Sequence, residues 1–366
     1  MRAGYVGAAG RPVAAGGPLE PDAFVMPGCY AGPSASWRPA EDAPRLNTTL
    51  RRADFRMHLS ERAPAKVNLS LLVGSQDARG YHELFTVFMP IDVYDELDFD
   101  IEARPPGAGP SWLQVVCSGV DGEANLVARA LRALEALTGW TFDGQVVVKK
   151  QIPVGAGLGG GSADAAVALR AGTRVLVEAG GQVLDRGALG ALARTLGADV
   201  AFFLDPRPAI GRGIGELLES LVLPRLHLVL VYLDHHLSTA RVYESFDALR
   251  QPEDPSAFSL RAASAGILWR QLSEEFASGE LDRNDAPSAI AALLSNDLEE
   301  ASFELFPALV EAKRVLLREG ALGALMSGSG PTVFGVCRDR VAAEELCARL
   351  RRRGLNAIVA AAGEVP

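Results

Sequence analysis

Pro153-Val-Gly-Ala-Gly-Leu-Gly-Gly-Gly-Ser162 is the most informative segment of the chain. It lies between a β-prone run, residues 145–152, and a helical pattern that opens at Ser162. Five of its residues are glycines, which let the backbone approach a ligand without interference from a Cβ atom. Backbone N–H groups at the start of a helix favour a bound phosphate. The stretch therefore predicts a phosphate-binding loop between a strand and a helix.

The loop differs from two common glycine-rich nucleotide-binding motifs. It is not a Walker A loop, because no Gly-Lys-Ser/Thr occurs in the chain. Gly155, Gly157 and Gly160 match the dinucleotide pattern G-x-G-x-x-G formally. A dehydrogenase, however, needs an acidic residue at the end of a second parallel strand about 20 positions further on. Glu178 stands there in helical-looking sequence, so this function is disfavoured.

The elements on either side of the loop predict an α+β protein. Upstream lie four β-prone runs, counting the one that leads into the loop, and one helical pattern. Downstream lie a strand, several helical stretches and a final hairpin–helix–strand series. That final ββαβ order is typical of a split βαβ sandwich of the ferredoxin type. The predicted strands are 65–74, 83–91, 96–101, 145–152, 227–233 and 356–361; the hairpin lies around 327–331, and the helices are 120–139, a helix from 162, stretches within 238–319, and 340–353.

Composition excludes several classes of protein. The chain has 366 residues, of which 48% are hydrophobic and 22% charged, as expected for a globular protein of two or three domains. It contains no run of 18 apolar residues, so no membrane span is predicted. The net charge of −9 and the lack of a basic stripe argue against nucleic acid as a partner. Four cysteines without a C-x-x-C motif fit a reducing cytoplasm and no structural metal.

Residues 1–56 are rich in Gly, Ala, Pro and Arg and show neither helical nor strand periodicity. We predict an unstructured extension there, or a start codon assigned too early, with Met57 as the natural first residue.

Three motifs, in this order, resemble the GHMP kinase superfamily, and the resemblance covers most of residues 57–366. They are Ala63-Pro-Ala-Lys66-Val-Asn68-Leu, the glycine loop, and Met326-Ser-Gly-Ser-Gly330-Pro-Thr-Val-Phe334. Within the superfamily, Gly80-Tyr81-His82 and Leu196-Gly-Ala-Asp199-Val resemble the kinases that act on 4-diphosphocytidyl-2-C-methyl-D-erythritol in the non-mevalonate isoprenoid pathway.

The resemblance implies a two-domain kinase. Residues 57–220 would form a ribosomal-S5-like domain with the ATP loop, residues 221–366 a ferredoxin-like domain, and ATP would meet a small-molecule substrate between them. The implied reaction moves the γ-phosphate of ATP to the 2-hydroxyl of the diphosphocytidyl substrate. Two alternatives stay open: a homoserine or mevalonate kinase, and a catalytically silent sensor on the same fold.

The resemblance also implies two catalytic residues, Asp199 as the base and Lys66 as its cationic partner. Phosphoryl transfer needs a group that orients the acceptor hydroxyl and a cation that stabilises developing charge. The alternative for Asp199, which follows Gly-Ala, is a helix N-cap. The alternative for Lys66 is a lysine on an edge strand with its ammonium in water. Asn68, two residues on, shares a strand face with Lys66 and is a candidate contact for substrate.

The other substrate contacts are aromatic or polar. By resemblance, Tyr81 and Tyr243 sandwich the cytosine ring, His82 hydrogen-bonds its edge, and Thr239 is a further candidate contact. Core packing is the alternative for each aromatic ring.

The ATP site is expected to comprise the loop and the lysine before it, with Mg²⁺ arriving with ATP and Ser162 as its candidate protein ligand. Lys150 reaches the ATP or else lies at a solvated strand end. The helix entry Ser162-Ala163-Asp164 departs from the Ser-Ser-Asn of many family members. The expected ATP-binding residues are Lys150, Pro153, Gly155, Gly157, Leu158, Gly159, Gly160, Gly161 and Ser162.

Overall fold

The computed structural model describes residues 56–78, 80–118, 122–250 and 253–365. These described residues all belong to one compact unit. The predicted extension, residues 1–56, lies outside the described residues apart from Arg56. No helix in the described ranges combines the length and the apolar character that a membrane crossing needs.

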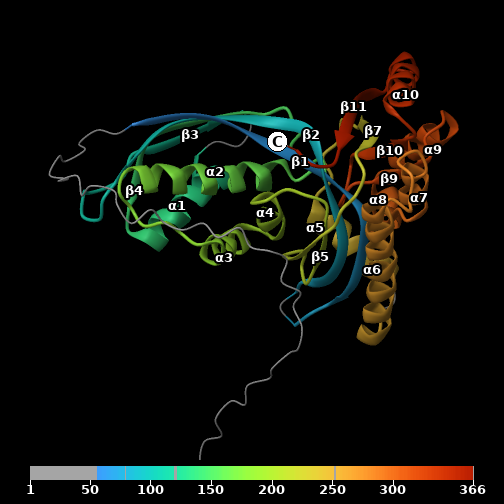
Figure 1. Ribbon diagram of the computed structural model, residues 1–366, viewed down its shortest axis with the longest axis horizontal. Coiled ribbons are helices and arrows are strands. Elements are labelled where there is room, and N and C mark those ends of the chain that lie inside the picture. Colours follow the sequence, from blue (N-terminus) through green and yellow to red (C-terminus); the bar gives the residue numbers. More distant parts are fainter. Residues whose placement is uncertain (1–55, 79, 119–121, 251–252, 366) are drawn as a thin grey trace, which may run out of the picture. The chain divides into compact units, whose positions relative to one another are not determined.

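The α+β prediction is confirmed: the described residues form one mixed sheet of eleven strands with helices packed on it (Figure 1). The main path through the sheet is β3-β4-β2-β11-β7-β10-β9, and β1, β5, β6 and β8 pair beside it. The strands are β1 Met57–Gln76, β2 His82–Arg104, β3 Leu113–Cys117, β4 Thr141–Lys149, β5 Ala209–Arg212, β6 Leu217–Ser220, β7 Leu226–Tyr232, β8 Ser295–Asn296, β9 Gly323–Met326, β10 Val333–Cys337 and β11 Asn356–Ala362.

The long hairpin of β1 and β2 corrects one prediction. Residues 83–91 and 96–101 are not two strands but parts of the single strand β2. Their apparent separation is a bulge: Pro64 pairs with Tyr94 and Ala65 with Ile91, which leaves Asp92 and Val93 of β2 without partners on β1. Strand β11 joins β2 at this bulge, where Ala362 pairs with Ile91.

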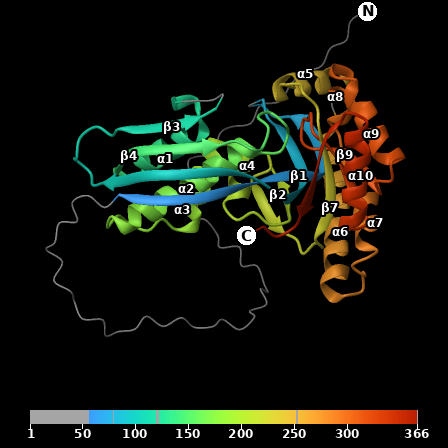
Figure 2. The ribbon, with the colours of Figure 1, turned by 90° about the horizontal axis from the view of Figure 1, so that it is seen from above.

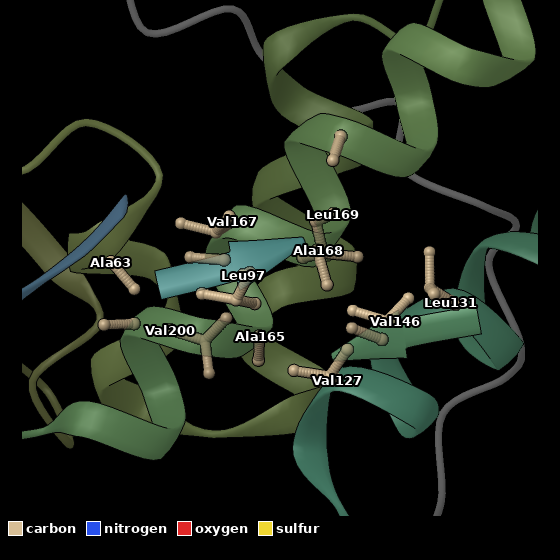
Figure 3. Packing of buried hydrophobic residues seen from close by; sticks show 14 of the residues in the cluster. Ala63, Leu97, Val127, Leu131, Val146, Ala165, Val167, Ala168, Leu169 and Val200 are labelled. Carbon is tan, nitrogen blue, oxygen red and sulfur yellow. The ribbon is translucent and has the colours of Figure 1, made fainter. Parts of the chain in front are cut away.

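Helices α1 and α2 pack against the strands next to the glycine loop, and α3 and α4 pack against these two helices. Figure 3 shows part of this core, in which Ala165 and Val167 of α2 lie among Leu97 of β2, Val127 of α1 and Val200 of α4. The elements are η1 Gly122–Ala124, α1 Leu126–Thr138, α2 Gly160–Glu178, α3 Arg186–Leu196 and α4 Ala198–Phe203.

Three predicted boundaries in this region are wrong. The helix predicted from residue 120 begins at Leu126, because the Asn125 side chain accepts a hydrogen bond from the N–H of Val127 and caps it there. The helix after the loop begins at Gly160, two residues before Ser162. Strand β4 ends at Lys149 instead of residue 152, because the backbone N–H groups of Gln151 and Ile152 donate to the Asp95 side chain and not to a neighbouring strand.

The split βαβ prediction is confirmed by the order β11-β7-β10-β9, in which all neighbours are antiparallel. Alternate residues of β7 enter two cores: Leu228 and Leu230 face β1 and β2, whereas Val229 and Val231 face the helices. Helices α9 and α10 lie against the latter face (Figure 2). The helices of this part are α5 Thr239–Leu249, α6 Pro255–Ser278, α7 Ala286–Ala292, α8 Glu299–Leu305, α9 Ala308–Arg318 and α10 Arg340–Arg352.

Candidate active site

The glycine loop lines a cavity of about 530 Å³. Its walls come from β1, the loop and α2, from α4 and α5, and from the turn between β9 and β10. Sequence segments more than 200 residues apart thus meet at one site. The cavity brings together most of the predicted site residues: Lys66, Asn68, Lys150, Pro153, Gly155, Gly157, Gly159, Gly160, Gly161, Ser162, Asp199, Thr239 and Tyr243.

Lys66 is buried in the wall of this cavity, with 4% of its surface exposed. Its Nζ lies 2.5 Å from Asn68 Oδ1, 3.2 Å from the Gly157 carbonyl oxygen and 3.6 Å from a carboxylate oxygen of Asp199. Burial lowers the pKa of Lys66, and the Asp199 carboxylate opposes this shift. Lys66 and Asn68 therefore share a strand face, as predicted, and the ammonium of Lys66 is not in water.

Asp199 lies in the first turn of α4, and its side chain is about one-third exposed. The N-cap of α4 is Gly197, so the alternative prediction of a capping role for Asp199 is wrong. The carboxylate faces the cavity beside Lys66. A carboxylate and an ammonium so placed can orient a hydroxyl and stabilise charge on a phosphoryl group.

The middle of the glycine loop is fixed by its own backbone. The N–H of Lys66 donates to the carbonyl of Leu158, at 2.9 Å. The carbonyl of Gly157 accepts from Ser327 Oγ, at 2.9 Å, as well as from Lys66. Leu158 is buried and does not line the cavity, so it anchors the loop. A Cβ at Gly157 would lie 2.2 Å from the Ser327 carbonyl oxygen, so only glycine fits there.

Gly161 provides a test of the phosphate site. It lies in the first turn of the 19-residue helix α2 and lines the cavity, and a Cβ there would touch only Leu126 at 3.5 Å. Gly161→Ala should leave folding stability unchanged or slightly raised, since Ala favours a helix. It should raise the KM for ATP by about tenfold, because a methyl group hinders phosphates that approach the helix N-terminus.

The matched control is Gly190→Ala within α3, where a Cβ meets only the end of the Arg194 side chain at 3.6 Å. Steady-state kinetics and thermal melting of both variants check the expectation. An unchanged KM for ATP in Gly161→Ala would contradict the phosphate site.

Lys150 is not a solvated strand end. Its Nζ lies 2.5 Å from Asp95 and 2.7 Å from Asp164, and its side chain is mostly buried. Burial opposes the charge of Lys150, but Asp164 and Asp95 outweigh it and raise the lysine's pKa. Burial also raises the pKa of Asp164 to about 7, with Lys150 opposing this and Asp95 adding to it. Asp95 was not predicted as a site residue.

Tyr243 and His82 form an aromatic pair beside the cavity. Their ring centroids are 5.0 Å apart, and Tyr243 lines the cavity whereas His82 lies behind it. His82 Nδ1 is 2.8 Å from the Gly74 carbonyl oxygen, and its Nε2 is 3.4 Å from the Asp247 carboxylate. Burial raises the pKa of Tyr243, and Asp199 adds to the shift.

Tyr81 lies apart from this aromatic pair. It is 56% exposed in the turn between β1 and β2 and does not line the cavity. Thr239, by contrast, lines it, and its Oγ1 lies 2.9 Å from Ser329 Oγ in the third motif.

Within the described ranges, no three His, Cys, Asp or Glu side chains converge as a metal site. Ser162 and Asp199 nevertheless offer oxygen atoms to the cavity. These are the hard ligands that suit a Mg²⁺ held mainly by phosphates and water.

Two family models match the chain: "GHMP kinases N terminal domain" matches residues 125–205 and "GHMP kinases C terminal" matches residues 277–356. The chain is 41% identical to the 4-diphosphocytidyl-2-C-methyl-D-erythritol kinase of Anaeromyxobacter sp. (strain K), over 78% of this chain and 83% of that protein. The chain belongs to the GHMP kinases. The kinase of the same name from Pelotomaculum thermopropionicum is 40% identical over 81% of this chain and 95% of that protein.

Solved structures agree with this family assignment. A crystal structure of 4-(cytidine 5'-diphospho)-2C-methyl-D-erythritol kinase has 34% identity and a TM-score of 0.61, and the match covers 84% of this chain and all of that one. A homoserine kinase from Cytophaga hutchinsonii has 18% identity, a TM-score of 0.60, and coverage of 86% of this chain and 96% of that one. At that level of identity, the second likeness shows the fold alone.

Proposed function

We propose that this GHMP kinase transfers the γ-phosphate of ATP to the 2-hydroxyl of 4-diphosphocytidyl-2-C-methyl-D-erythritol. The observation that carries the proposal is the Lys66–Asp199 pair in the wall of a cavity that the glycine loop also lines. Relatives about 40% identical over most of the chain are named as kinases of this substrate. The intact pair disfavours a silent sensor.

Asp199 is the proposed base. Its carboxylate accepts the proton of the acceptor hydroxyl as the hydroxyl oxygen bonds to the γ-phosphorus and the bond from that phosphorus to the β–γ bridging oxygen breaks, releasing ADP. Lys66 lies between the carboxylate and the loop, so its ammonium stabilises the charge that develops on the transferred phosphoryl group. Asn68 holds Lys66 through its Oδ1, while its Nδ2 donates to Thr86 Oγ1 at 2.8 Å.

The phosphates of ATP are proposed to lie against Gly159, Gly160, Gly161 and Ser162. These four residues line the cavity where α2 begins. The N–H groups in the first turn of a helix have no partner within the helix, so they are available to bind phosphate oxygens. Ser162 is the proposed protein ligand of a Mg²⁺ that accompanies ATP and neutralises its phosphates.

We also propose the division into two domains, residues 57–220 and 221–366. It is supported by the cavity, which is lined by residues of both segments, as expected for a site between two domains. Cys337 and Cys347 are buried free thiols, which suits the proposed location in a reducing cytoplasm.

Tyr243 is the proposed stacking partner of cytosine. Tyr243→Ala should raise the KM for the diphosphocytidyl substrate by about tenfold or more, since base–aromatic stacking contributes about 1–3 kcal/mol. The KM for ATP should stay within about twofold, because the proposed stacking contact is made with the base of the acceptor substrate and not with the nucleotide. Kinetics with each substrate varied in turn measure both constants.

Tyr81→Ala is the companion variant in this experiment. If Tyr81 completes a sandwich when substrate binds, as the resemblance implies, its removal should also weaken the diphosphocytidyl substrate. An equal loss of affinity for both substrates in Tyr243→Ala would indicate core packing and would remove the stacking role.

Product analysis tests the proposed reaction. Incubation with ATP, Mg²⁺ and the diphosphocytidyl substrate should give ADP and a product with one new phosphomonoester, which phosphorus NMR locates on the tertiary carbon. Formation of ADP and free phosphate without a phosphorylated product would contradict the proposal.

A further inference from the structure

Asp95 is a fully buried carboxylate in β2, with no exposed surface. One of its oxygens, Oδ1, accepts hydrogen bonds from the backbone N–H groups of Gln151 and Ile152, at 2.6 and 2.9 Å. The other oxygen, Oδ2, accepts from Lys150 Nζ at 2.5 Å. Asp95 does not line the cavity, so it has no direct contact with a ligand there.

These bonds place Asp95 at the entry of the glycine loop, and Asp95 also lies close to the exit. Gln151 and Ile152 lead directly into Pro153, where the loop begins. At the far end, a Cβ on Gly160, the first residue of α2, would lie 3.2 Å from Asp95 Oδ2. Lys150 completes the link, because it bonds both Asp95 and Asp164 of α2. One carboxylate thus fixes the distance between the entry and the exit of the loop.

Lys150 itself faces the cavity. An ammonium has three N–H donors, and the two carboxylates take two of them. Held in this way, Lys150 loses little freedom when its remaining donor bonds a ligand, since the ordering is already done before binding.

We infer that Asp95 is a positioning residue for the phosphoryl donor, acting through Lys150 and the backbone of the loop. The inference rests on the proposed function, which places ATP at this loop. A misplacement of about 1 Å can lower the rate of an enzyme reaction by a factor of about 100, which shows how strongly function depends on the position of the groups that hold a substrate. The loss of this anchor should therefore weaken nucleotide binding strongly.

Two substitutions separate the contacts of Asp95. Asp95→Asn keeps an oxygen for the N–H groups of Gln151 and Ile152 but turns an amide NH₂ toward Lys150. Asp95→Ala removes every contact. We expect the affinity for Mg–ADP, measured by isothermal titration calorimetry, to fall by about tenfold in Asp95→Asn and by more in Asp95→Ala. The KM for the acceptor substrate should stay within about twofold.

Asp98→Asn is the matched control. Asp98 lies three residues along the same strand and pairs with Lys149, the neighbour of Lys150, but this pair is exposed and away from the cavity. Its loss should leave Mg–ADP affinity unchanged.

A merely structural role predicts a different result. Asp95→Asn would then melt at a lower temperature yet bind Mg–ADP as tightly as the wild type, and this outcome would overturn the inference. If Asp95→Ala does not fold, Asp95→Asn alone decides. If the wild-type protein binds no Mg–ADP, the proposed function fails, which is distinguishable from failure of the role of Asp95.

Discussion

Replacing Asp199 by Asn is expected to lower kcat by about 10²–10⁴-fold, the usual contribution of a general acid–base group. The amide keeps the size of the side chain but cannot accept the proton of the acceptor hydroxyl. The KM values for both substrates should change little, because the neighbouring groups keep their positions. Steady-state kinetics with saturating ATP and acceptor measure the effect.

Stability should distinguish this loss from misfolding. Asp199 is at the start of the short helix α4 but is not its cap, so the neutral amide loses an interaction with the helix dipole of about 0.3–1 kcal/mol and, in addition, the ion pair with the buried Lys66. Asp205→Asn, an exposed carboxylate just beyond α4 that pairs with Arg207, is the control and should keep full activity. Near-normal turnover in Asp199→Asn would remove this residue from the mechanism.

Replacing Lys66 by Met is expected to lower kcat by about 10²–10³-fold, the range found when a donor that stabilises transition-state charge is removed. Stability should fall only modestly. Burial lowers the pKa of Lys66, so an apolar side chain of similar length relieves the cost of burying a charge, but Asn68 Oδ1 and the Gly157 carbonyl oxygen lose their donor. Thermal melting and kcat together test both halves of this expectation.

The double variant Asp199→Asn/Lys66→Met shows whether the two residues act as one unit. Their side chains are 3.6 Å apart, close enough to couple, so the combined loss in kcat should be smaller than the product of the single losses. Strictly multiplicative losses would mean that each residue acts on a different step and would contradict the pairing.

The local chemistry of the site could be predicted because it depends on short spacings. Lys66 and Asn68 are two residues apart in a strand, so their side chains had to share a face. The glycine loop joined β4 to α2 as expected. The start of α2 was missed because Gly159 has a positive φ of 72°, a left-handed conformation that lets the chain enter the helix at Gly160.

The role of Asp95 could not be recognised while β2 was divided into two strands. The bulge at Asp92 and Val93 interrupts the alternation of the sequence and hides the continuity of the strand. One signal was present: Leu97, Phe99 and Ile101 alternate into the core, and the same alternation carried back reaches Asp95. A carboxylate on a core face requires partners, and those partners come from the entry to the loop.

The different surroundings of Tyr81 and His82 follow from the point at which β2 begins. His82 is the first residue of β2 and is buried, whereas Tyr81 precedes the strand, so a sequence motif that names both does not place both in the same surroundings. His82 packs behind Tyr243, whereas Tyr81 is exposed in the turn. Position along the chain alone could not show that neither residue lines the cavity.

The most direct test of the proposed function is an ADP-release assay with three acceptors: the diphosphocytidyl methylerythritol, homoserine and mevalonate. The proposal predicts the highest kcat/KM for the diphosphocytidyl substrate, at least about 100-fold above the other two, because only that substrate offers a base to Tyr243. An equal or higher kcat/KM with homoserine or mevalonate would contradict it.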